Sequence, residues 1–200
     1  MSFLYDPAGN RKYLTITERT AFLAAARELP PPARAFCRTL AFTGARISEV
    51  LSLTPRQVDA AAGVVIFECL KKRRRGVYRA VPVPGELIAE LRQLDAAERP
   101  NDSRNIEAAR LWSCSRTTGW AQVKRAMAIA GLTGSHASPK GLRHGYGVAA
   151  LQAGVPVTTV KKWLGHARLS TTEIYVDAVG EEEQALAKRH WATFYLAGEK

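Results

Sequence analysis

The sequence predicts a mainly α-helical chain with one small antiparallel β-sheet, that is, an α+β fold class. Two observations carry this prediction. Apolar residues recur at helical spacing between helix-capping signals along most of the 200 residues. Two runs rich in β-branched and aromatic residues, VVIFECL and VYRAVPV, interrupt that pattern. A chain of this length buries about 70% of the surface that its unfolded state exposes, so one hydrophobic core suffices.

Three helices are expected before residue 54. The first begins at Thr15, which has capping-box spacing with Glu18, and ends before the prolines at 30–32. The second spans about 32–42 and the third 46–53, with Gly44 permitting the bend between them. The residues expected to face the core from the first two helices are Phe22, Leu23, Ala26, Leu29, Phe36, Cys37 and Leu40.

The two apolar runs that follow are expected to pair as a hairpin, with KKRRRG as its turn. Further helices are expected at about 84–97 and 118–130, at 139–154 after the N-cap Ser138, and at 156–164 before Gly165. Ser170 and Glu173 again have capping-box spacing, which predicts a short helix with Tyr175 in its second turn. The last helix is expected at 181–196.

Charge and composition restrict the function. The 29 Lys+Arg against 18 Asp+Glu give a net charge of +11, which favours a polyanionic partner, most simply nucleic acid. Cys37, Cys69 and Cys114 are an odd set without metal-ligand spacing, which argues against a disulfide framework and a zinc site. The sequence has no long apolar run and no signal-peptide pattern, so we expect a cytoplasmic protein without membrane insertion.

Five side chains that suit phosphate chemistry stand in three motifs. FTGARISEVLSL places Arg46 at a helix start, where a guanidinium can present its planar fork to a phosphate. SPKGLRHGYG places Lys140 and Arg143 three residues apart, on one helical face, so that both could reach one phosphate. KKWLGHARLSTTEIY contains His166 and Tyr175. Each residue alone would more often be structural; the case rests on the set and on its spacings of 97, 23 and 9 residues.

This set resembles the catalytic set of the tyrosine recombinase (phage integrase-type) family, and the resemblance covers residues 15–178. It implies that Tyr175 attacks a DNA phosphodiester to form a 3′-phosphotyrosyl link and expel a 5′-hydroxyl. Arg46 and Arg143 would neutralise the phosphate, and His166 would add a hydrogen bond. Neither a cofactor nor a metal is implied. The nearby positive charge is expected to lower the pKa of Tyr175.

In the family, a lysine in a hairpin turn protonates the departing oxygen. Lys71 resembles that position most closely, and Lys72 is the alternative. The rest of the cationic turn is expected to contact the flanking DNA. The residues expected to do so are Lys72, Arg73, Arg74, Arg75 and Arg79.

Lys140 stands where the family usually has histidine, three residues before Arg143. A lysine is ordinarily protonated at neutral pH and cannot act as a base. Three accounts are therefore open for Lys140. It adds positive charge and a phosphate hydrogen bond, or neighbouring cations shift its titration until it accepts the tyrosine proton, or the site is impaired. Type IB topoisomerases, which resemble the family mechanistically, commonly have lysine in a corresponding arrangement, and this favours an active site.

The expected organisation is a single catalytic domain over 1–200, with an N-terminal arm at 1–14, a catalytic core at 15–178 and a C-terminal helix at 179–200. No separate N-terminal core-binding domain is expected, as in the short invertases that switch fimbrial promoters. The C-terminal helix packs either on its own core or on a neighbouring subunit. The implied partner is double-stranded DNA with inverted-repeat half-sites, bound by a homo-tetramer, and accessory DNA-bending proteins are a further candidate partner.

Two other functions compete with this one. A topoisomerase IB-like enzyme would relax DNA by the same chemistry. Alternatively, VAALQAGVPVTTVKKWLGH has the pattern of a helix-turn-helix, with Trp163 exposed on its second helix, which would suit a non-catalytic DNA-binding protein. That pattern is weak, and it gives no reason for Arg46, the hairpin lysines and Tyr175 to occur at recombinase spacing.

Overall fold

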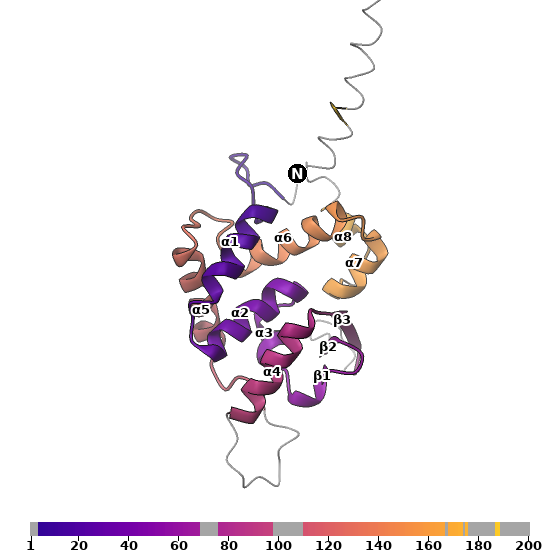
Figure 1. Cartoon of the computed structure of the whole chain (residues 1–200). Helices are drawn as coiled ribbons and strands as arrows, with labels where there is room; N and C mark the ends of the chain where they lie inside the picture. The colour runs from indigo at the N-terminus through magenta and orange to yellow at the C-terminus, as the bar shows by residue number, and fades with distance from the viewer. Residues whose placement is uncertain are drawn as a thin grey trace, which may run out of the picture.

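Helices form most of the computed structural model, which describes residues 4–68, 76–97, 110–166, 168–173, 175 and 187–188. A three-stranded antiparallel sheet lies along one side of the helices (Figure 1). The elements are α1 Ile16–Ala26, α2 Pro31–Thr43, α3 Ile47–Leu51, the 3-10 helix Pro55–Gln57, β1 Val58–Asp59, β2 Val64–Glu68, β3 Tyr78–Pro82, α4 Gly85–Ala97, α5 Arg116–Ile129, α6 Pro139–Gln152, α7 Val157–Leu164 and α8 Ser170–Glu173. The predicted fold class is confirmed.

The capping signals in the sequence locate several helix ends correctly. The Thr15 hydroxyl accepts a hydrogen bond from the Glu18 amide at 3.2 Å, and the Glu18 carboxylate accepts one from the Thr15 amide at 2.8 Å. Helix α2 ends at Gly44, whose φ of 60° lies in the left-handed region. A Cβ at Gly44 would lie 2.6 Å from the Tyr146 ring, so both the bend and the close packing require glycine here.

The hairpin is present and has one strand more than predicted. Strands β2 and β3 pair antiparallel, with Val65 opposite Val81 and Phe67 opposite Arg79. Strand β1 adds to the outer edge of β2. The sequence analysis missed β1 because two residues are too few to display an alternating pattern. Val65, Phe67 and Val81 are fully buried, so one face of the sheet packs on the helices.

Helix α2 lies at the centre of the fold, in contact with α1, α4, α5 and α6 (Figure 1). Its residues Phe36, Cys37 and Leu40 belong to the main hydrophobic core, as predicted. A second, smaller cluster joins the second half of α6 to α7 and includes Tyr146 and Leu164. This second cluster fixes α7 and the segment after it against α6, where Arg143, His166 and Tyr175 lie.

Two local predictions about the C-terminal part are wrong. Ser170 lies inside α8 rather than at its cap, and Tyr175 follows the helix in a turn instead of occupying its second turn. Trp163 is partly buried against both hydrophobic clusters, so the exposed ring that the helix-turn-helix hypothesis expected is absent. Nearly all of the helix expected at 181–196 lies outside the described residues. None of the helices within the described ranges is long and apolar enough to cross a membrane.

Candidate active site

Arg46 lies at the start of α3, as predicted, and is tied to that helix by Glu49. The Arg46 amide donates to Glu49 Oε2 at 2.8 Å, and its Nη1 donates to Oε1 at 2.9 Å. The Arg46 side chain is 29% exposed, whereas that of Glu49 is 1% exposed. The guanidinium is therefore held in place on its buried side and accessible on the other.

The prediction that Arg79 contacts DNA is corrected by its position. Its side chain is 3% exposed and forms an ion pair with Glu49, Nη2 to Oε2 at 2.7 Å. Its Nε donates to the Trp163 carbonyl at 2.7 Å, and its guanidinium lies over the Phe67 ring. Arg79 follows the alternation of β3, which points it to the buried face of the sheet. It joins the sheet to α3 and α7 instead of reaching outward.

The Glu49 carboxylate lies between these two arginines. Burial on its own would raise the pKa of Glu49, but the ion pair and hydrogen bonds with Arg79, and those with Arg46, outweigh burial and hold the pKa below its ordinary value. The carboxylate is thus ionised at neutral pH. Glu49 was not among the predicted site residues, although its place three residues after Arg46 was a signal for such a contact.

Arg143 projects from α6 into the interior and joins the other two motifs. Its Nη1 donates to the Gly44 carbonyl at 2.6 Å, two residues before Arg46, and its Nη2 donates to the Leu164 carbonyl at 2.7 Å, two residues before His166. Burial, followed by the charge of Arg46, lowers the pKa of Arg143 to about 10, so the guanidinium remains charged at neutral pH.

Lys140 lies on the same helix but differs from Arg143 in its surroundings. Lys140 is exposed, whereas Arg143 is buried. The two positive groups therefore approach any shared phosphate differently: Arg143 from within the fold and Lys140 from the solvent side.

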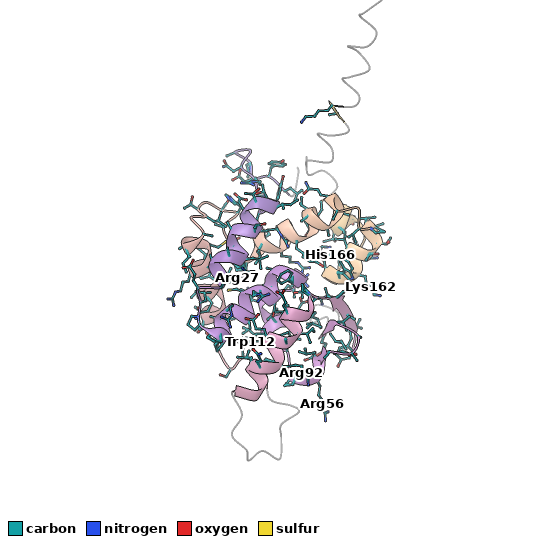
Figure 2. The ribbon with its side chains drawn as sticks, in the orientation of Figure 1. Arg27, Arg56, Arg92, Trp112, Lys162 and His166 are labelled. Carbon is teal, nitrogen blue, oxygen red and sulfur yellow. The ribbon has the colours of Figure 1, made fainter. Side chains whose placement is uncertain are left out.

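His166 lies where α7 ends, next to α6 (Figure 2). Its Nδ1 is 2.9 Å from the hydroxyl of Thr172, which is fully buried on α8. Burial, followed by the charge of Arg143, lowers the pKa of His166 to about 3, so the ring is neutral. The contact with Thr172 fixes the ring plane and leaves Nε2 as the nitrogen that can face a ligand. Thr172 was missed by sequence reasoning.

Tyr175 stacks beside His166, with ring centroids 6.1 Å apart and planes 29° apart. The tyrosine is 2% exposed, and its ring passes over Gly147 of α6, where a Cβ would come within 2.6 Å of it. The expected fall in its pKa is wrong: burial raises the pKa of Tyr175, and the opposing charges of Arg143 and Arg46 do not offset burial. The free protein therefore holds a protonated phenol.

His144, which the sequence analysis did not single out, contacts this phenol. Its Nδ1 is 3.1 Å from the Tyr175 hydroxyl. Burial, followed by the charges of Lys140 and Arg143, lowers the pKa of His144 to about 4. Its place directly after Arg143 in LRHGYG was the available signal.

The structure thus brings together Arg46, Arg143, His166 and Tyr175, which lie far apart in the sequence. Hydrogen bonds of Arg143 connect their segments, and the charges of both arginines act on the histidine and the tyrosine. The hairpin residues Lys71, Lys72, Arg73, Arg74 and Arg75 lie outside the described residues, between the ends of β2 and β3. What is described is a buried phenol beside two fixed guanidiniums and two neutral imidazoles.

The sequence profile of the Phage integrase family matches residues 12–182, which include every one of these motifs. The chain belongs to the phage integrase family. It is 32% identical over 202 aligned residues to the tyrosine recombinase XerD of Xanthomonas axonopodis pv. citri (strain 306), covering 92% of this chain and 64% of that relative. It is 33% identical over 152 residues to the XerD of Mycobacterium tuberculosis (strain CDC 1551 / Oshkosh), covering 71% and 46%.

Solved structures agree with this family fold. The XerH site-specific recombinase bound to palindromic difH substrate, a post-cleavage complex, superposes with a TM-score of 0.75 at 23% identity, covering 96% of this chain and 57% of XerH. The catalytic domain of bacteriophage HP1 integrase superposes with a TM-score of 0.60 at 23% identity, covering 88% and 93%. The chain thus spans about half to two thirds of the length of its curated relatives and most of an integrase catalytic domain.

Proposed function

We propose that this member of the phage integrase family is a site-specific DNA recombinase that cleaves and rejoins strands through a 3′-phosphotyrosyl link at Tyr175. The observation that carries the proposal is the position of the Tyr175 phenol, buried beside His166 and within the field of Arg46 and Arg143. A tyrosine that only packs in a core needs neither of these cations.

The charges of the site suit attack on a phosphodiester. In the pentacoordinate transition state the non-bridging oxygens gain negative charge, and the guanidiniums of Arg46 and Arg143 stabilise that charge more strongly than they stabilise the ground state. The Nε2 of His166, which has no hydrogen-bond partner within the described residues, adds a hydrogen bond to the same phosphate. The covalent link to Tyr175 conserves the energy of the phosphodiester, so religation requires only the return of the 5′-hydroxyl.

The leaving oxygen needs a proton donor, and we assign this role to Lys71, with Lys72 as the alternative. Both follow β2, whose neighbour β3 is joined to the site through Arg79. Arg73, Arg74 and Arg75 complete a cationic turn that would contact the phosphates flanking the cleaved bond.

The partner that this chemistry requires is double-stranded DNA. The XerH structures hold their difH substrate, and the Tn1549 transposon integrase structures hold circular intermediate DNA or transposon right end DNA. By analogy we propose inverted-repeat half-sites, a homo-tetramer on two duplexes and, where the sites require bending, accessory DNA-bending proteins. Such an enzyme would act in the cytoplasm on the DNA of the cell or of a mobile element. No cofactor is needed for these steps.

A nicked suicide duplex tests the proposal. Inverted repeats in the DNA flanking the gene supply the candidate site, and the nick lets the cleaved fragment leave so that the covalent complex accumulates. The unmodified protein is expected to form a band shifted by the mass of the DNA, and Tyr175→Phe, which differs by one hydroxyl, is expected to form none. Equal amounts of the complex from both proteins would refute the assignment. Relaxation of plasmids that lack the repeats would instead favour a topoisomerase.

Two substitutions at Lys140 separate the accounts of this departure from the family. Lys140→Ala removes the ammonium and Lys140→His restores the usual family residue. If Lys140 contributes charge to the phosphate, Lys140→Ala is expected to slow cleavage by about tenfold, because an exposed charge is partly screened by solvent. Unchanged cleavage in both variants would show that Lys140 has no chemical role.

A further inference from the structure

The Tyr175 hydroxyl has a partner that no motif of the sequence analysis assigned. Of the described residues, His144 is the one that places a hydrogen-bonding atom within reach of this oxygen, with Nδ1 at 3.1 Å. The two rings are tilted by 60°, with centroids 5.6 Å apart. His144 comes from α6 and Tyr175 from the turn after α8, so the contact is tertiary. It joins a histidine directly to the oxygen that the proposed function makes the nucleophile.

Nucleophilic attack from this site requires a proton acceptor. Burial raises the pKa of Tyr175, so at neutral pH the phenol carries its proton. That proton must leave as the phenolic oxygen bonds to phosphorus, because a protonated oxygen bonded to phosphorus would be a strongly acidic, high-energy species. A group that takes it must lie within hydrogen-bond reach of the hydroxyl.

The other candidate acceptors are poorly placed for this task. The Nδ1 of His166 is engaged with Thr172, and its ring stacks beside the tyrosine ring instead of meeting the hydroxyl. Lys140 is exposed to solvent, and an ordinary ammonium has no lone pair with which to accept a proton. His144 alone among these three combines contact and the chemistry of a base.

The surroundings of His144 keep its ring neutral. Burial, then Lys140 and Arg143, then Lys12, disfavour the imidazolium and lower the pKa of His144 to about 4. Its Nε2 is buried and has no hydrogen-bond partner within the described residues. When Nε2 carries the ring proton, the lone pair of Nδ1 faces the Tyr175 hydroxyl. Within the part of the chain that the structure describes, the titratable and charged groups that face the ring are Lys12, Lys140, Arg143, His166 and Tyr175.

Substrate makes this neutral ring a better base. A phosphodiester bound between Arg46 and Arg143 places a negative charge in the site, which offsets the cations and favours an imidazolium. The base is therefore weak in the free protein and strengthens when the scissile phosphate is bound. Ionisation of the buried nucleophile is then coupled to the presence of its target.

We propose that His144 is the general base of the strand-cleavage step. The Tyr175 oxygen forms a bond to phosphorus, the bond between phosphorus and the 5′-oxygen breaks, and the phenolic proton moves to Nδ1 of His144. The departing 5′-oxygen receives its proton from a different donor. In religation, the imidazolium returns the proton to the phenolic oxygen as that oxygen leaves phosphorus. This inference rests on the proposed function and assigns the role for which the sequence offered only Lys140.

His144→Asn is the variant that tests this role. The amide retains a polar atom near the position of Nδ1 but cannot take a proton. Covalent-complex formation with the suicide duplex is expected to fall about 10²–10⁴-fold at pH 7, the usual range for loss of general base catalysis, with duplex binding unchanged. The loss is expected to shrink as pH approaches the ionisation of Tyr175, since tyrosinate needs no base. His136→Asn, the same change at a histidine that contacts Glu18, is the control and is expected to cleave normally.

A modified duplex separates the base from the acid. Sulfur in place of the bridging 5′-oxygen leaves as a thiolate and needs no proton. His144→Asn is expected to remain slow on this duplex. If this duplex restores the cleavage rate of His144→Asn, His144 donates the proton to the leaving group, and the proposal is overturned. If His144→Asn loses the same factor in cleavage rate at every pH, His144 has a merely structural role and the proposal is overturned. A pH-dependent loss of cleavage in Lys140→Ala that is absent from His144→Asn would overturn the proposal too.

A measurement on the unmodified protein covers the case in which His144→Asn does not fold. Nitrogen-15 NMR of histidine-labelled protein, assigned by comparison with Tyr175→Phe, reports which ring nitrogen carries the proton. Nδ1 of His144 is expected to be unprotonated. A protonated Nδ1 would donate to the hydroxyl and overturn the proposal. If instead the unmodified protein never forms a Tyr175-dependent complex, the proposed function itself fails, which is a separate and recognisable outcome.

Discussion

Replacing the buried carboxylate of Glu49 with its amide isolates the role of the charge that holds two arginines. Glu49→Gln preserves the shape of the side chain and removes its negative charge. The two carboxylate oxygens make four close contacts, to the amide and Nη1 of Arg46 and to Nη1 and Nη2 of Arg79. Glutamine retains one acceptor oxygen and turns an NH₂ group toward donors, so about half of these contacts become unfavourable.

The expected cost follows from burial. The Glu49 and Arg79 side chains are 1% and 3% exposed, and breaking such a pair leaves an uncompensated buried charge worth about 3–5 kcal/mol. Because one acceptor is retained, the lower end, about 3 kcal/mol, is expected for the loss in unfolding free energy. With an m-value of about 2 kcal/mol per molar urea, the unfolding midpoint falls by about 1.5 M.

Urea unfolding followed by circular dichroism measures this shift. The matched control is Glu86→Gln, the same change at a carboxylate whose side chain is 82% exposed and 3.5 Å from Arg38. An exposed pair contributes about 0–1 kcal/mol, so this variant is expected to unfold close to the unmodified protein. Equal shifts in the two variants would refute the reasoning, because the predicted difference comes from burial alone.

The pH dependence of the same pair has a definite sign. The pKa of Glu49 in the folded protein lies below its unfolded value, which is about 4.3. The stabilisation is therefore fully present above that unfolded value and is lost as pH falls through the folded pKa. The difference between the unmodified protein and Glu49→Gln is expected to be constant near neutrality and to shrink below about pH 4. A difference in unfolding free energy between the two proteins that grows below about pH 4 would contradict a lowered pKa for Glu49.

Two further predictions concern the placement of Tyr175 and of His166. Gly147→Ala puts a Cβ 2.6 Å from the Tyr175 ring, so the ring must move away from α6. This displacement of Tyr175 is expected to slow cleavage by about 10²-fold while DNA binding persists. Gly85→Ala is the control, because a Cβ at Gly85 has no atom within 4 Å. Thr172→Val removes the hydroxyl that holds His166 Nδ1, with an expected loss of about 1–3 kcal/mol on urea unfolding and about tenfold slower suicide-substrate cleavage. Unchanged cleavage in either variant would show that the contact does not position the site.

The sequence predicted the helices well because capping residues and apolar spacing act locally. It also singled out Arg46, Arg143, His166 and Tyr175, which the structure brings together, because they stand in recognisable motifs. It failed on Arg79, which was grouped with the arginines of the turn although its strand register, visible only once β2 and β3 are paired, points it inward. A one-residue difference in register decides between a buried and an exposed side chain.

The environment of each group was harder to predict than its identity. The neighbouring cations alone predict a lowered pKa for Tyr175, whereas burial, which the sequence does not display, raises it. The contact of His144 with Tyr175 depends on the turn after α8, where the capping pattern predicts a helix, so the sequence gives no sign of it. Such contacts form between segments that are distant in the chain, and a sequence pattern does not give the distance between these segments in space.

The two main-chain carbonyls bonded to Arg143 have a thermodynamic consequence for any anion that binds there. A guanidinium has five N–H groups, and the bonds to Gly44 and Leu164 use only two of them. Immobilising an arginine side chain costs about 1.5–2 kcal/mol of rotamer entropy, and here folding has already met that cost, before the ligand arrives. The anion binds a guanidinium whose orientation is already fixed by the fold. Its affinity therefore depends on the packing that holds Gly44 and Leu164 in place around Arg143. By linkage, such a bound anion should in turn raise the unfolding temperature of the protein.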